Sequence, residues 1–163
     1  MNNPCKFKYT GAMVLGMHDA LVELTGIIAG LTFAIASNRI IIMTGAIATV
    51  AASLSMAAAN YMAQRADGKP DAWVSAMYTG IMYVGTSVAL LIPFCIIPNR
   101  FWALGIMGGV VVAIVFAFNW CIGQINKRPW WRAFWEMLGV CLGVSVASFI
   151  IGQAAKYFLG VQI

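Results

Sequence analysis

Four long stretches without a charged side chain constrain the fold of this 163-residue chain more than any other feature. No Asp, Glu, Lys or Arg occurs in segments 40–64, 72–99, 101–126 and 137–155. A helix that crosses the hydrocarbon core of a bilayer needs about 20 mainly apolar residues. Each stretch has about this length and is continuously apolar, whereas the strands of a membrane β-barrel alternate. A fifth segment, 9–38, is similar apart from His18, Asp19 and Glu23.

The sequence therefore predicts an all-α integral membrane protein with five transmembrane helices in one domain, residues 1–163. The expected helices are approximately 9–38, 40–64, 72–98, 101–125 and 133–159. Only 9% of the residues are charged, against about a quarter in soluble domains. The connections are short, so none is expected to fold separately. The N-terminal lysines precede a long helix rather than a short apolar segment with a cleavage site, so we expect no removable signal peptide.

The lysines and arginines are distributed unequally between the two sides of the expected bundle. Most of them lie on the side of the N-terminus: Lys6, Lys8, Arg65, Lys69, Lys127, Arg128 and Arg132. The other side has Arg39, Arg100 and Lys156. Because positive residues concentrate in cytoplasmic loops, we expect a cytoplasmic N-terminus and an extracytoplasmic C-terminus. The net charge of +5 is then a topology signal, and no nucleic-acid partner is expected.

The sequence offers little that would suit an enzyme or a fixed metal centre. Its four cysteines are single and scattered, which indicates neither a structural zinc site nor a disulfide framework. No nucleophile with an adjacent base and no phosphate-binding loop is recognisable. We therefore expect a protein that is not an enzyme and that holds no permanently bound cofactor.

Two compositional features concern packing and the membrane surface. Small residues are dense between 46 and 59, and Gly26 and Gly30 lie four residues apart. Small residues let helices approach closely in lipid, so these positions form either a dimer seam or ordinary contacts within one subunit. The aromatic run 130–135 lies beside basic residues. It is typical of an interfacial belt that contacts anionic lipid, rather than of an aromatic ligand site.

The run GMHDALVELTG, residues 16–26, places three ionisable side chains inside an apolar helix. Asp19 and Glu23 are four residues apart and share one helix face. An acid inside a membrane costs a few kcal/mol and marks a functional site by default. With the imidazole of His18, the two carboxylates suit divalent Fe²⁺, Mn²⁺ or Zn²⁺ better than monovalent copper. A proton relay is a second use, and a third interpretation is structural, with His18 paired to Asp19 and Glu23 bonded to polar neighbours.

Other polar groups are expected in the same half of the membrane. A hairpin turning between Asn38 and Arg39 places Asp19 at the depth of Ala58, between Met56 and Asn60. The third helix adds a stripe with Thr79, Tyr83 and Thr86, and Asn119 and Glu136 belong to that half as well. Together these groups predict a vestibule that opens to the cytoplasm. Taken singly, Met56, Tyr83 and Asn119 are more typical of a packed core than of a pathway.

Two of these segments resemble motifs of a known family. GMHDALV, residues 16–22, resembles the G-x-N-D-G-L-V run on the first helix of the vacuolar iron transporter family. ASLSMAAANY, residues 52–61, resembles its second-helix run G-A-x-S-M-A-x-G-E-Y. LVELTG at 21–26 and YTG at 78–80 are similar to a short prokaryotic branch, which implies a prokaryotic plasma membrane. The resemblance implies a homodimer that moves Fe²⁺, Mn²⁺ or related divalent ions out of the cytoplasm in exchange for protons.

By the same resemblance, the ion path would run between the two copies of the first and second helices. Asp19 would be the acid of this path and Met56 its thioether, while Glu23 is a candidate from the residues alone. The chain departs from the motif at His18, which replaces Asn, and at Asn60, which replaces Glu and removes a negative charge. The short turn 65–71 leaves no room for the acidic metal-binding domain of the vacuolar members.

Two other hypotheses stay open. The first is a non-transporting membrane partner or assembly subunit, because Asn60 and the missing domain weaken metal capture. The second, weaker one is a small proton-coupled exporter of organic cations, since acids in an aromatic-rich apolar bundle would also serve that purpose.

Overall fold

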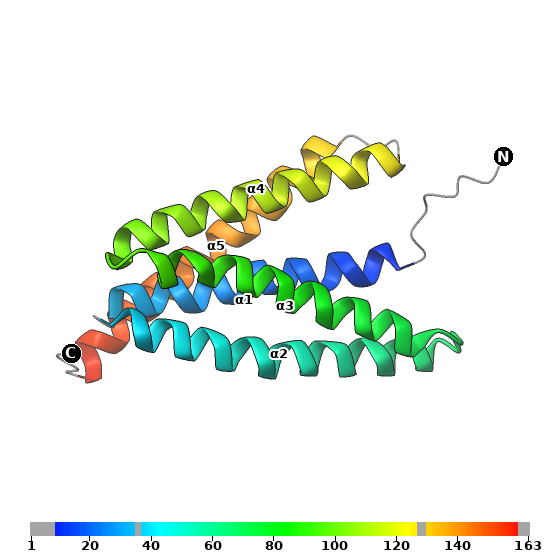
Figure 1. Cartoon of the computed structure of the whole chain (residues 1–163), viewed down its shortest axis with the longest axis horizontal. Coiled ribbons are helices and arrows are strands. Elements are labelled where there is room, and N and C mark those ends of the chain that lie inside the picture. The colour runs from blue at the N-terminus through cyan, green and yellow to red at the C-terminus, as the bar shows by residue number, and fades with distance from the viewer. Residues whose placement is uncertain (1–8, 35–36, 127–129, 160–163) are drawn as a thin grey trace.

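The computed structural model describes residues 9–34, 37–126 and 130–159 and is drawn in Figure 1. The prediction of an all-α chain with five helices is confirmed for this part of the sequence, and each helix is long and apolar enough to cross a membrane. The helices are α1 (Thr10–Ala34), α2 (Asn38–Ala66), α3 (Ala72–Ile96), α4 (Arg100–Asn126) and α5 (Trp130–Leu159).

Helix α1 occupies the centre of the bundle and contacts all four other helices. Its most extensive contacts are with α5 and α3, whereas α2 packs mainly against α3. In Figure 1, α2 and α4 lie on opposite sides of the α1–α3 pair. Of the five spans, α1 is the most buried. The helix that carries the acids is therefore the innermost one, while α2, α4 and α5 expose much of their apolar surface.

The connections alternate between the two ends of the bundle. The start of α1, the α2–α3 turn and the end of α4 lie at one end, and the α3–α4 turn and the end of α5 lie at the other (Figure 1). The α2–α3 turn is closed by Gly68, whose φ of 68° favours glycine. Its amide donates to the carbonyl of Arg65. The expected assignment of the basic residues to two sides of the membrane assumes this alternation.

The largest difference from the expected helix bounds is at the first turn. Helix α1 ends at Ala34, four residues before the expected boundary, and α2 begins at Asn38. The side chain of Asn38 explains where α2 starts, since its Nδ2 donates to the carbonyls of Ile97 at 2.9 Å and Pro98 at 3.1 Å. Asn38 thereby ties the start of α2 to the α3–α4 turn. At the other end of the chain, α5 begins at Trp130, earlier than the expected 133.

Glycines allow α1 to approach two of its neighbours closely. A Cβ at Gly16 would lie 2.1 Å from the carbonyl oxygen of Thr79 on α3. A Cβ at Gly26 would lie 2.8 Å from Ser148 Oγ, and one at Gly30 would lie 3.4 Å from the Ser148 carbonyl oxygen on α5. Gly26 and Gly30 therefore pack within the chain, as the second of the two interpretations of this pair proposed.

Candidate functional site

Glu23 and Tyr83 form a hydrogen-bonded pair between α1 and α3. Tyr83 is fully buried, and its phenol donates to Glu23 Oε2 at 2.8 Å. Glu23 itself is only partly buried, so its carboxylate lies between the core and the accessible surface of α1. A hydrogen bond from a neutral donor to a charged acceptor is stronger than one between neutral groups. Tyr83 therefore holds the Glu23 carboxylate in one place.

Asp19 lies one turn before Glu23, on a partly exposed face of α1. Within the described residues its carboxylate takes part in no hydrogen bond or ion pair. His18 and Glu23 are nevertheless close enough to interact electrostatically with the Asp19 carboxylate. Leu15, one turn earlier on this face, is 45% exposed. Of the structural interpretation, the direct pairing of His18 with Asp19 thus finds no support in the geometry, whereas the bonding of Glu23 to a polar neighbour is present as its contact with Tyr83.

One chain alone does not assemble a metal-ligand cluster in the part that the structure describes. No three His, Cys, Asp or Glu side chains there converge closely enough to hold a metal ion. Two carboxylates and an imidazole on successive turns therefore do not form a closed site by themselves. A site built on Asp19 needs further ligands from water, from thioether or carbonyl groups, or from a second chain.

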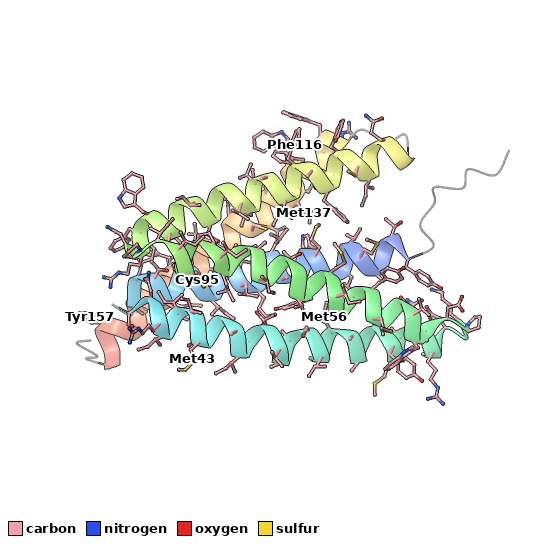
Figure 2. All side chains as sticks on the ribbon, in the orientation of Figure 1. Met43, Met56, Cys95, Phe116, Met137 and Tyr157 are labelled. Atoms are coloured by element: carbon pink, nitrogen blue, oxygen red, sulfur yellow. The ribbon has the colours of Figure 1, made fainter. Side chains whose placement is uncertain are left out.

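Met56 is directed toward the bundle. It is partly buried and packs against the apolar core, to which α1 contributes Met17 and Leu21. Met43, on the same helix, is 58% exposed and points away from the bundle (Figure 2). Met62, the third methionine of α2, is 70% exposed. The methionine that the sequence motif singles out is thus the one that packs against the core.

Asn60 joins α2 to α3 through its side-chain amide. Its Nδ2 donates to the Ser75 carbonyl and to Ser75 Oγ, both at 3.2 Å, and to Thr79 Oγ1 at 2.5 Å. A carbonyl can only accept, so the nitrogen side of the amide must face α3. Thr79 Oγ1 also contacts the carbonyl of Ala12 on α1 at 3.1 Å. One amide and one hydroxyl therefore tie three helices together.

This arrangement corrects the expected depth of Asn60. Through Thr79, Asn60 is level with Ala12 and Gly16 of α1, not with Asp19. The reason is the early end of α1, which moves the hairpin turn and shifts every α1–α2 pairing toward the N-terminal end. Thr79, expected along the path, is fully buried, and its hydroxyl is engaged in these helix contacts.

Two further polar residues of the expected vestibule, Asn119 and Glu136, lie on α4 and α5. Asn119 is buried and donates to the Val115 carbonyl at 2.8 Å and to the sulfur of Met137 at 3.3 Å, so it joins α4 to α5. Glu136 is exposed on α5.

Ser75 was not singled out from the sequence, although it continues the stripe of Thr79 and Tyr83 by one more turn toward the N-terminus of α3.

The aromatic run at the start of α5 forms a cluster. Trp131 stacks on Phe134 with ring centroids 6.0 Å apart, and Trp135 packs edge-on against both. Trp131 and Trp135 are each about half exposed, as an interfacial belt requires. Residues 127–129, which include the basic pair of this expectation, lie outside the described part of the chain.

Fold and site together define an integral membrane protein of five helices whose innermost helix carries two acids. The model of the VIT family matches residues 10–69, which cover α1, α2 and the first residues of the following turn. Over these residues the match confirms the predicted resemblance to this family. The family indicates a membrane transporter of metal ions and is not a family of enzymes. Among curated proteins, none matches the chain.

Proposed function

We propose that this protein exports divalent metal ions of the Fe²⁺ and Mn²⁺ type from the cytoplasm in exchange for protons. One observation carries the proposal: the Asp19 carboxylate is partly exposed and has no hydrogen-bonding partner in its own described chain, within an apolar span. A charge in that position is unfavourable unless it faces protein or water. The Asp19 carboxylate is therefore available as a ligand for a cation that passes along this face of α1.

The active form is a homodimer in which α1 and α2 face their copies. The partly exposed α1 face with Asp19 must be shielded from lipid. Helix α2 offers small exposed residues against which the second copy can pack closely: Ala46, Ala51, Ser55, Ala58 and Ala59. Small residues permit close helix contact in a membrane. A second copy would also supply the further ligands that one chain lacks.

The residues of the site have distinct roles in this proposal. Asp19 and Met56 ligate the ion, one as a carboxylate and the other as a thioether, with His18 beside them. Glu23, held by Tyr83 at 2.8 Å, is the proton carrier, because a carboxylate that is fixed by a neighbouring donor can exchange a proton without moving. The N-terminus lies in the cytoplasm of a prokaryotic cell, and the Trp131–Trp135 cluster contacts anionic lipid.

Vesicle transport tests the proposed activity. Purified protein in liposomes should take up Fe²⁺ and Mn²⁺, and the lumen should become more alkaline in step as protons leave in exchange, as reported by an enclosed pH dye. Metal uptake without a linked pH change would remove proton exchange from the proposal. Transport of a lipophilic organic cation that Fe²⁺ does not inhibit would replace the metal by another substrate.

Cysteine cross-linking tests the dimer. In a background without the native cysteines, Ser55→Cys on the exposed face of α2 should form a disulfide-linked dimer in membranes. Ile92→Cys is the matched control, since Ile92 is also exposed, at 48%, but lies on α3. Equal cross-linking at both positions, or none at Ser55→Cys and neighbouring α2 positions, would argue against this interface.

A non-transporting partner is the second candidate. The observation in its favour is that Asn60, at the position of the family's motif acid, is engaged in holding α3. This candidate predicts a stable complex with another membrane protein and no metal-dependent flux from the purified chain. Flux by the homodimer alone would eliminate it.

A further inference from the structure

A cavity of about 410 Å³ opens at the end of the bundle where α1 starts and the α2–α3 turn lies. We call it the turn pocket. Helix α1 contributes Gly11 and Leu15 to its wall, and α2 contributes Asn60 and Gln64. The α2–α3 turn and the start of α3 complete the lining. The turn pocket is therefore formed within one chain, between its first three helices.

The α1 wall of the turn pocket leads toward Asp19. Leu15 is the innermost α1 residue that lines the pocket, and Asp19 follows it by four residues. Residues four apart share one face of a helix and lie about 6 Å apart along its axis. Gly11 and Leu15 are exposed and Asp19 is partly exposed, so this face of α1 is accessible from the pocket to the carboxylate.

The α2 wall leads toward Met56 in the same way. Gln64 and Asn60 line the pocket, and Met56 follows four residues further from the turn. Through its bond to Thr79, Asn60 lies level with the first two turns of α1. Met56 is one turn deeper and so approaches the level of Asp19. Both walls therefore lead, within one helical turn, from the pocket to a proposed ligand of the ion.

Leu15 is the side chain that separates the pocket from Asp19 along α1. It has no polar group, and it is 45% exposed, so the core does not hold it in one position. Exposed side chains of this kind change rotamer rapidly. On the opposite wall, by contrast, the Asn60 amide is held by α3. An apolar side chain at a constriction excludes water and ions until the space is wetted.

We propose that the turn pocket is the entrance through which a hydrated divalent cation reaches Asp19, and that Leu15 is the apolar gate between them. This inference rests on the proposed function, which makes Asp19 the ligand and the N-terminal side the cytoplasmic one. Each protomer then has an entrance of its own. The size of the side chain at position 15 sets how fast an ion reaches the acid, but not how tightly the acid binds it.

Thiol labelling tests this route without requiring transport. In a background without the native cysteines, Asp19→Cys is treated with a cationic, membrane-impermeant methanethiosulfonate in right-side-out and inside-out vesicles. The new thiol should react from the cytoplasmic side, severalfold faster when Leu15→Ala is added and more slowly with Leu15→Phe. Leu142→Ala and Leu142→Phe are the matched controls and should leave the rate unchanged, because Leu142 is also exposed, at 58%, but lies on α5.

A third variant narrows the pocket itself. A Cβ at Gly11 meets nothing within 4 Å, so Gly11→Leu should slow the labelling while the fold persists. Gly105→Leu, at another open glycine on α4, is its control.

A labelling rate that is indifferent to both Leu15 variants, or labelling from the opposite side alone, would overturn the inference. The fate of the proposed function is read separately, from metal uptake by the chain with Asp19 intact. If labelling responds as expected but this chain takes up no metal, the entrance stands and the proposed transport fails. If it takes up metal while labelling ignores position 15, transport stands and the ion reaches Asp19 by another route.

Discussion

The phenol of Tyr83 donates to Glu23 Oε2 at 2.8 Å across the α1–α3 contact. Tyr83 has no exposed surface, whereas Glu23 is partly exposed, so the pair joins the core to the α1 face that carries Asp19. This bond gives the two acids of α1 different surroundings. Glu23 is anchored by a buried donor, and Asp19, one turn away, is left for a ligand.

A double-mutant cycle should measure this pair. Tyr83→Phe and Glu23→Gln each remove the charge-assisted bond, so their effects on the free energy of unfolding should overlap. We expect a coupling of about 1–2 kcal/mol, obtained from reversible unfolding in detergent. Strictly additive effects would show that the two side chains do not interact. In vesicles, Tyr83→Phe should alter proton exchange more than metal affinity.

Asn60 should resist replacement by an isosteric acid. Asn60→Asp removes the N–H donor of the hydrogen bonds that the Ser75 carbonyl and Thr79 Oγ1 accept. It also places the new carboxylate next to the Ser75 carbonyl oxygen. We expect a loss of about 1–3 kcal/mol of stability. Asn99→Asp is the matched control, because Asn99 uses its Oδ1 to accept from the Phe101 amide at 3.0 Å, and Asp keeps that acceptor. Equal stability changes for the two variants would contradict the amide orientation.

Gly16 should be intolerant of any side chain. Gly16→Ala would bring a methyl group to 2.1 Å from the Thr79 carbonyl oxygen, so α1 and α3 must separate. Overpacking of this kind costs about 1–3 kcal/mol, and the melting temperature should fall. Gly105→Ala on α4 meets nothing within 4 Å and should be neutral or slightly stabilising, since alanine favours the helix. A similar melting temperature for both variants would refute the close α1–α3 contact.

The aromatic cluster of α5 should report on lipid. Trp131 and Trp135 are exposed beside Arg132, and basic residues near the surface attract anionic headgroups. Brominated anionic lipid should therefore quench tryptophan fluorescence more than brominated neutral lipid does. Arg132→Gln should reduce this difference in quenching. A difference that neither salt nor this change affects would mean that the cluster lies at the membrane interface without electrostatic attraction to anionic headgroups.

The number of helices could be predicted because each span must satisfy its own backbone within the apolar core, and the charge-free stretches show that directly. The end of α1 could not, because the contact that fixes it, Asn38 with the α3–α4 turn, joins residues that are 59 and 60 positions apart. The depth of Asn60 was wrong for the same reason, since it followed from the assumed turn.

The site residues also differ in how far the sequence alone reveals them. Asp19 and Glu23 are visible in the sequence because acids are expensive in an apolar helix. The partner of Glu23 is less visible in the sequence, since Tyr83 on its own is more typical of a core residue than of a site residue. The role of Asn60 depends on which side of its amide faces α3, and no sequence pattern carries that information. Gly26 and Gly30 indicate close packing but not the helix against which they pack.

Metal uptake by Asp19→Asn decides whether the ion passes the acid of α1, because this change removes one charge and keeps the shape of the side chain. The native chain, Asp19→Asn and the control Glu136→Gln are reconstituted as dimers at equal density, and Fe²⁺ and Mn²⁺ uptake is followed in time. We expect uptake by the native chain and by Glu136→Gln, and only the leak of protein-free vesicles for Asp19→Asn. Uptake by Asp19→Asn at the rate of the native chain would show that this carboxylate is not part of the ion path.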